Sequence, residues 1–132
     1  MSKSNLNGTI PPQFFLNNVQ LVTFHIYDNI KLSGSLPYLP SNSSLRCLDI
    51  RGTSISGGLS SSYLKIVNAR LMLPDLGFNI SEINNDIKKY DSVLAKCDIR
   101  HDNYGSSYIE CRSYIDSDAE NHCPDIIPKN KL

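Results

Sequence analysis

The residues best suited to chemistry in this sequence are its four cysteines and three histidines. Those in the C-terminal third are Cys97, His101, Cys111, His122 and Cys123. Thiolate and imidazole groups are ligands that Zn²⁺ prefers, so these side chains would suit a structural zinc site. Their spacing contains no cysteine pair of the kind that forms a compact zinc knuckle. The alternative is a set of disulfides in the C-terminal region, and four cysteines allow three pairings between which the sequence does not choose.

Cys47 and His25 form a second combination, because a thiol beside an imidazole on neighbouring strands could act as a nucleophile. Nothing in the sequence supplies an oxyanion hole, which favours a structural cysteine that is unpaired or bonded to the C-terminal region. Asp116, Asp118 and Glu120 resemble part of a cation loop but lack the glycine and glutamate of an EF-hand. The sequence also contains no HExxH, paired-carboxylate or glycine-rich phosphate motif. We therefore expect a protein that is not an enzyme and that uses no metal ion or cofactor.

The composition narrows the possible partners. Thirteen basic and thirteen acidic residues give a net charge of zero, and no segment is basic enough to predict binding to nucleic acid. The longest apolar runs are shorter than the roughly 20 residues of a membrane helix, so we expect no membrane contact by this segment. A chain of 132 residues predicts one structural unit.

The elements that position these side chains come from internal repeats. One six-residue phrase occurs three times, at Leu6–Pro11 (LNGTIP), Leu32–Pro37 (LSGSLP) and Ile55–Ser60 (ISGGLS). Between the copies lie Leu21–Asn29 (LVTFHIYDN) and Leu45–Thr53 (LRCLDIRGT). In both, apolar residues occupy the first, fourth and sixth places and a small polar residue the ninth, and repeats of about 20–29 residues with this pattern form stacked coils. The glycines at Gly8, Gly34 and Gly57 predict backbone turns that a Cβ would hinder.

These phrases resemble the repeat of the plant-type leucine-rich repeat family, closely over Leu6–Ser60 and loosely as far as Cys111. The segment from Leu94 to Pro124 is similar to the cysteine-bearing C-terminal caps of extracellular members of that family. The resemblance implies that Cys97, Cys111 and Cys123 are disulfide candidates in the cap, rather than zinc ligands. It also implies that Asn29 hydrogen-bonds the backbone of adjacent coils, a role that Thr53 can fill in part.

We therefore predict an α/β leucine-rich repeat solenoid, with short parallel β-strands on its concave face and turns or 3-10 helices on its convex side. One coil cannot bury its apolar face alone, so stacked coils share a continuous core. The expected organisation is about four repeats over residues 1–96, the first one partial, a C-terminal cap over 97–124 and a polar tail over 125–132. The spacing of Ile83, Ile87, Tyr90 and Leu94 predicts one convex-side helix that starts near Asn84 or Asn85.

The concave face is the expected ligand-binding surface, because residues that flank the inward-facing pair of each strand point the other way. The residues predicted to bind there are Thr23, His25, Tyr27, Asp28, Asp49, Arg51, Arg70, Asp98 and Arg100. This mixture suits polar recognition of a protein, a peptide or a glycan. The alternative interpretation is that these positions are merely solvated.

Three N-glycosylation acceptor triplets, at Asn7, Asn42 and Asn79, agree with an oxidising compartment. We therefore predict a non-catalytic recognition module of a receptor-like protein in the extracellular space or at the cell surface. The N-terminal ten residues contain no apolar stretch that would serve as a signal peptide, so the alternatives are a cytoplasmic protein or a chain whose start lies upstream. A further alternative is a structural spacer or truncated remnant with no ligand of its own.

Overall fold

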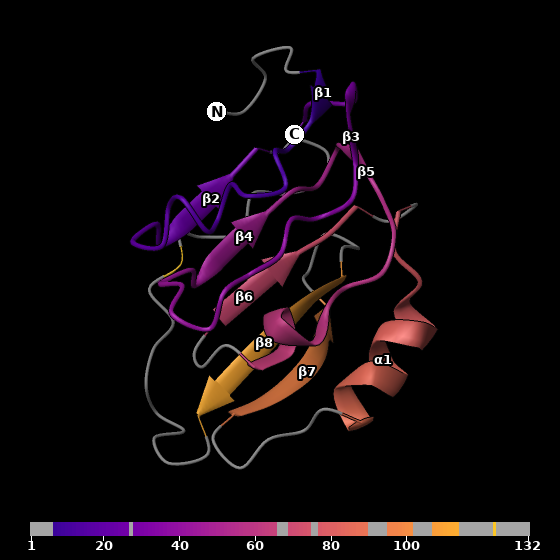
Figure 1. Ribbon diagram of the computed structural model, residues 1–132. Helices are drawn as coiled ribbons and strands as arrows, with labels where there is room; N and C mark the ends of the chain where they lie inside the picture. The colour runs from indigo at the N-terminus through magenta and orange to yellow at the C-terminus, as the bar shows by residue number, and fades with distance from the viewer. Residues whose placement is uncertain are drawn as a thin grey trace.

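Ten short elements make up the part of the chain that the computed structural model describes, which comprises residues 7–26, 28–65, 69–74, 77–89, 95–101, 107–113 and 123. In chain order they are β1 (Gly8–Thr9), β2 (Thr23–His25), β3 (Leu32–Gly34), β4 (Cys47–Asp49), β5 (Ser54–Ile55), the 3-10 helix η1 (Ser61–Lys65), β6 (Ala69–Met72), α1 (Ile80–Lys89), β7 (Ala95–His101) and β8 (Ser107–Ser113). The strands form two sheets, which Figure 1 shows at different sides of the molecule.

The larger sheet has five strands in the order β2-β4-β6-β8-β7. Its first three strands are parallel, and they pair Phe24 with Leu48 and Leu48 with Leu71. These three apolar side chains are buried in one core cluster, because equivalent positions of successive repeats lie side by side in the sheet. The strand positions expected from the repeat spacing are therefore observed as far as β6.

The smaller sheet is parallel, has the order β1-β3-β5, and is built from the repeated glycine-containing phrases. Gly8, Gly34 and Gly57 have positive φ angles of 87°, 88° and 105°, which confirms the turns predicted at these positions. A Cβ at Gly34 would lie 2.8 Å from Cγ2 of Thr9, so β1 and β3 also approach closely at this position.

The prediction of a regular leucine-rich repeat solenoid is wrong. In such a solenoid the strand with Cys97 and Ile99 would lie next to β6 and parallel to it. The structure places β8 next to β6 in the antiparallel direction, with Leu71 opposite Ile109, and β7 pairs antiparallel with β8 at the edge. The described chain thus forms one mixed sheet and one parallel sheet with one α-helix.

The change of direction after β6 has a physical basis in the sequence. Asn29 donates from Nδ2 to the carbonyl of Ile26 at 3.0 Å, and Thr53 donates from Oγ1 to the carbonyl of Ile50 at 2.7 Å. Both bonds stabilise the turn of the residue's own coil and do not join adjacent coils, as was predicted for Asn29. The equivalent position after β6 is Leu76, whose side chain has no group that can form such a bond. The next two strands are seven residues long and pair with each other, which fills the edge of β6 without another coil. The boundary expected between residues 96 and 97 falls inside β7.

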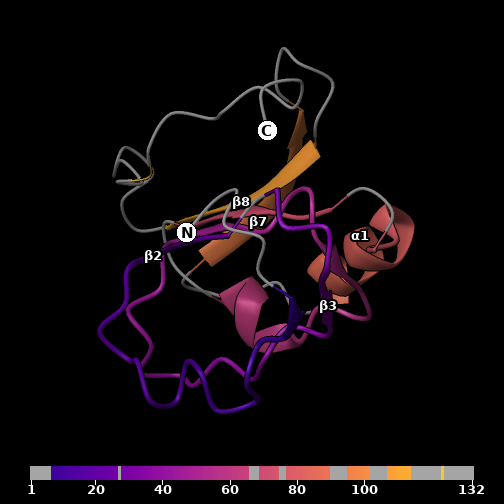
Figure 2. The ribbon, with the colours of Figure 1, turned by 90° about the horizontal axis from the view of Figure 1, so that it is seen from above.

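The core lies beneath the five-stranded sheet, with η1 on that side (Figure 2). Phe15 packs edge-on against Phe24 and Tyr63, with ring centroids 5.4 and 6.4 Å apart. The Tyr63 hydroxyl donates a 2.6 Å hydrogen bond to the carbonyl of Pro37, and burial raises the pKa of this phenol. The aromatic cluster therefore ties η1 to the turns of the earlier repeats.

Helix α1 begins at Ile80, four to five residues before the predicted start. Oδ1 of Asn79 accepts hydrogen bonds from the backbone N–H groups of Ser81 and Glu82 at 2.9 and 3.2 Å, so Asn79 is the N-cap. The prediction missed this start because it followed the apolar spacing and not the capping residue. Tyr90 and Leu94, which completed that spacing, lie outside the described residues.

Candidate functional site

The five-stranded sheet has one face that points away from the core, here called the polar face. It is defined by two rows of laterally paired residues, Thr23-Cys47-Arg70-Glu110-Asp98 and His25-Asp49-Met72-Tyr108-Arg100. These positions alternate with the buried row that contains Phe24, Leu48 and Ile109. Because side chains of a strand alternate between faces, the two polar rows share one surface.

A buried ion pair between Asp49 and Arg51 lies at the C-terminal end of β4, the second strand of the sheet. Arg51 donates from Nε to Oδ1 of Asp49 at 2.9 Å and from a terminal nitrogen to Oδ2 at 2.8 Å. Asp49 and Arg51 are 1% and 4% exposed, so neither side chain is accessible to a large ligand. The two contacts fix Asp49, at the end of β4, to Arg51, two residues later. They give these two predicted ligand-binding residues a structural role.

All four cysteines form disulfides. Cys97 and Cys111 join β7 to β8 within the core, and Cys47 joins Cys123 on the polar face. The three cysteines expected to form disulfides do so, and Cys47, which the sequence left unpaired or bonded to the C-terminal region, takes the second alternative. Sulfur atoms in disulfides are neither zinc-binding thiolates nor nucleophiles, so the chemistry considered for Cys47 with His25 is not available in this form. Two disulfides point to an oxidising environment.

The Cys47–Cys123 disulfide divides the polar face. Cys47 is 1% exposed on β4, the second strand of the sheet, and its partner lies 76 residues further along the chain. On one side remain Thr23, which is exposed, and His25, which is half-buried. On the other side lie the strands β8 and β7. The exposed polar groups of the face therefore lie on β2, β7 and β8, and Arg70 on the central strand β6 is half-buried.

His25 lies next to Asp49 on the polar face. Burial lowers the pKa of the His25 imidazole below its usual value of 6.5, the Asp49 carboxylate opposes this effect, and the Arg51 guanidinium adds to it. The neutral imidazole is thus favoured in the folded protein.

Strands β7 and β8 carry the exposed charges of the face, here called the β7–β8 margin and defined as Lys96, Asp98, Arg100 and Arg112. Arg112 contacts the buried carboxylate of Glu110 at 2.8 Å, and Arg100 lies 3.8 Å from Asp98. Both arginine side chains remain 47% exposed, so each can still meet a ligand. With the buried Glu110 included, three basic groups and two acidic groups give this part of the face a positive balance of one.

The structure brings some predicted binding residues together and separates others. Arg70 is half-buried, and its guanidinium carbon lies 5.5 Å from the centre of the Tyr108 ring. Asp28 lies beyond the end of β2, in a left-handed conformation with φ 60°. Tyr27 lies outside the described residues. Asp98 and Arg100 are in the same rows as the earlier positions, but one strand further from Arg70 than a regular solenoid would place them.

Sequence reasoning missed β8, which contributes Tyr108, Glu110 and Arg112 to the polar face. Over Ser107–Ser113 these polar or amphipathic residues alternate with Ile109 and Cys111. Such strict alternation is the signal of a half-buried strand, and it was present in the sequence. The repeat spacing instead predicted that the strand with Cys97 and Ile99 would follow β6 in the sheet.

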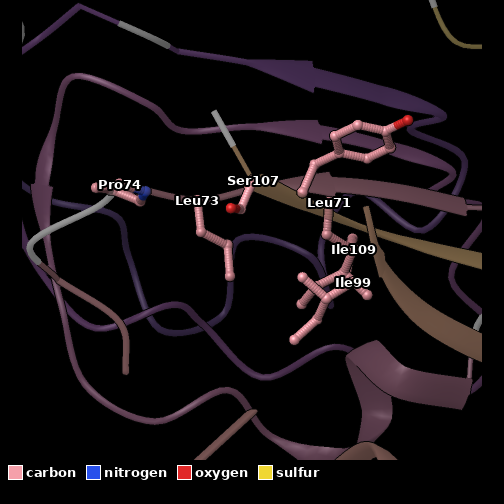
Figure 3. Close-up of a pocket in the computed structure, with 7 residues that line it drawn as sticks. Leu71, Leu73, Pro74, Ile99, Ser107 and Ile109 are labelled. Atoms are coloured by element: carbon pink, nitrogen blue, oxygen red, sulfur yellow. The ribbon is translucent and has the colours of Figure 1, made fainter. Parts of the chain in front are cut away.

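A small cavity of about 170 Å³ lies where β6, β7 and β8 meet. Figure 3 shows Leu71, Ile99 and Ile109 directed to the same side of the sheet, with Leu73 beside them and Pro74 and Ser107 nearby. Pockets for drug-sized ligands are usually about 300–1,000 Å³, so this cavity would hold one apolar side chain of a larger ligand rather than a small molecule.

The three asparagines of the glycosylation triplets are all exposed. Asn79 uses Oδ1 to cap α1, and a glycan would be attached through Nδ2, so capping and glycosylation are compatible at this residue. Whether Asn7, Asn42 and Asn79 carry glycans stays a prediction.

In the described ranges, no helix is long and apolar enough to cross a membrane, and no three His, Cys, Asp or Glu residues are grouped to hold a metal ion. No protein-family model matches this chain, and the comparisons with curated proteins and with solved structures gave no match.

Proposed function

We propose that this chain is a non-catalytic recognition module of the extracellular space that binds a peptide or a peptide segment of a protein through the β7–β8 margin. The observation that carries the proposal is the arrangement of the polar face. At β4 the face is occupied by a disulfide and a buried ion pair, whereas Lys96, Arg100 and Arg112 remain exposed on the paired strands β7 and β8.

The shape and chemistry of the margin favour a peptide over a glycan or a small molecule. The nearby cavity of about 170 Å³ is too small for a drug-sized ligand, and the groove of about 350 Å³ beside β7 is at the lower end of the range for such ligands. Tyr108 is half-buried and its ring contacts the Arg70 guanidinium, so this aromatic side chain is not presented as an open stacking surface for a sugar. Exposed arginines are well suited to carboxylates, because the guanidinium group can donate two parallel hydrogen bonds.

The extracellular part of the proposal is supported by the two disulfides and the three exposed acceptor asparagines. It is tested by the intact mass of the chain secreted from a eukaryotic host, before and after reduction, alkylation and deglycosylation. We expect protected cysteines and a glycan on at least one of Asn7, Asn42 and Asn79. Four free thiols and no glycan on soluble protein would overturn this part.

The recognition part is tested with a phage library of random linear twelve-residue peptides, selected on the oxidised protein and followed by measurement of synthetic peptides. We expect enriched peptides to contain Asp or Glu, and to bind the Arg100→Ala/Arg112→Ala variant about tenfold more weakly than the wild type. Lys31→Ala is the matched control, because Lys31 is exposed outside the five-stranded sheet. Absence of enrichment, or equal losses in the double variant and the control, would overturn the proposal.

A further inference from the structure

Strand β7 forms an open edge of the five-stranded sheet, because it is the last strand in the order and pairs with β8 alone among the described strands. At such an edge, half of the backbone N–H and C=O groups point out of the sheet. The hydrogen bonds of the preceding strands determine which residues carry these outward groups.

The alternation starts at β6. Arg70 donates its backbone N–H to the carbonyl of Arg46, and the carbonyl of Met72 accepts from the N–H of Ile50, so both residues direct their backbone groups toward β4. Their neighbours Ala69 and Leu71 consequently direct theirs toward β8, where they face Cys111 and Ile109.

The same alternation continues through β8 into β7. Since Ile109 and Cys111 use their backbone groups toward β6, Glu110 uses its groups toward β7, where it faces Asp98. The Cα atoms of Cys97 and Cys111 are 4.0 Å apart, which agrees with a non-hydrogen-bonded pair. The outward-directed backbone groups of β7 therefore belong to Cys97, Ile99 and His101.

These groups border a groove between β7 and α1, with a volume of about 350 Å³. The residues that line it include Asn84, Ile87 and Lys88 of α1 and Lys96, Asp98 and Ile99 of β7. Ile87 and Ile99 are half-buried and provide apolar surface, whereas Lys88 and Lys96 are exposed. In Figure 1, α1 lies beside β7 at the same end of the sheet.

The charges of the groove select the occupant. Among the described residues neither Lys88 nor Lys96 forms an ion pair, and Asp98 has Arg100 at 3.8 Å. A second copy of the chain would bring another set of these lysines to the same place. An extended peptide that alternates acidic and apolar residues would instead offer carboxylates to the lysines and apolar side chains to the isoleucines.

We infer that β7 and α1 form a groove that binds an extended acidic peptide as an additional strand, hydrogen-bonded to the outward backbone groups of Cys97, Ile99 and His101. This inference rests on the proposed recognition function and gives it a ligand conformation and chemistry. It adds main-chain contacts at the edge to the side-chain contacts of the β7–β8 margin.

The probe is a capped seven-residue peptide that alternates glutamate and valine, added to the full oxidised chain. Hydrogen exchange followed by NMR should show at least tenfold slower exchange at the amides of Cys97, Ile99 and His101. The amides of Lys96, Asp98 and Arg100 already face β8 and should change little. The same peptide N-methylated at every inner residue keeps its charge but cannot donate hydrogen bonds, so we expect at least tenfold weaker binding.

Charge is tested separately with Lys88→Glu and Lys96→Glu. Each should weaken binding of the glutamate peptide about fivefold. A peptide with lysine in place of every glutamate should bind these variants better than it binds the wild type. Lys31→Glu is the control with the same charge change. Three outcomes would overturn the inference. The N-methylated peptide could bind as tightly as the unmodified one, or the peptide could slow amide exchange only outside β7. The chain could also dimerise without peptide and protect the β7 amides in that way. If library peptides depend on Arg100 and Arg112 but do not protect the three outward amides, the inference fails and the proposed function stands.

Discussion

The Cys47–Cys123 disulfide closes a loop with a sequence separation of 76 residues, and we expect its removal to cause a large loss of stability. The chain-entropy relation assigns about 4 kcal/mol at 25 °C to a cross-link of this length, after the nested Cys97–Cys111 bridge has shortened the effective loop. Domains of this size are stable by about 5–15 kcal/mol, so the loss would be a large fraction of the total.

Cys123→Ala removes the cross-link but leaves the sulfur of Cys47 in its buried position. We therefore expect the variant to lose about 4 kcal/mol of unfolding free energy, and Cys47→Ala added to it to cost about 1 kcal/mol more from lost packing. Guanidinium chloride titration followed by tyrosine fluorescence suits a protein with seven tyrosines and no tryptophan. The m-value should rise, because the unfolded chain becomes more expanded.

A loss below about 1 kcal/mol for Cys123→Ala, with no change in m-value, would refute this reasoning. It would mean that the long-range cross-link does not restrict the unfolded chain, or that the two cysteines are not paired in solution. Alkylation of the unreduced wild-type protein in concentrated guanidinium chloride separates these outcomes, since a free Cys47 is labelled in the unfolded chain and a bonded one is not.

Three further predictions concern individual side chains. Asp49→Ala leaves the guanidinium of Arg51 buried without its carboxylate partner and should cost about 3–5 kcal/mol in urea denaturation, whereas a loss under 1 kcal/mol would contradict a buried pair. Asn79→Ala should cost about 1 kcal/mol of unfolding free energy through loss of the α1 N-cap. Asn79→Asp keeps the cap, and both variants remove the glycosylation triplet. Equal stability losses of the two variants would argue against capping. The pKa of His25 is lowered in the folded state, so the unfolded chain binds more protons below about pH 6.5 and stability falls as the pH decreases. His25→Gln should reduce the slope of Tm against pH between about pH 7 and 5. An unchanged slope would show that other groups cause this pH dependence.

The polar face could be predicted in part. Thr23, His25, Asp49 and Arg70 were placed on one surface because alternation within a strand is a local property of the extended backbone. The burial of Asp49 with Arg51 and the lateral shift of Asp98 were not predicted. Both depend on which strand and which distant cysteine lie against the sheet, and neither is encoded by the spacing within one repeat.

The sequence by itself determined the features that arise within a repeat or between adjacent repeats. These are the parallel pairing of β2, β4 and β6 and the positive φ angles of the repeated glycines. Each depends on a short range of sequence, where periodicity and residue type restrict the backbone strongly.

Tertiary structure alone decided the direction of β8, the position of β7 at the open edge and the pairing of Cys47 with Cys123. An antiparallel hairpin and a parallel coil can both bury Ile99 and Cys97, so their local apolar pattern does not distinguish the two arrangements. The choice depends on how well each strand fits the exposed edge of β6 and on cross-links between residues far apart in the chain. Those are non-local energies, and they replaced the predicted solenoid with a mixed sheet that has an open edge.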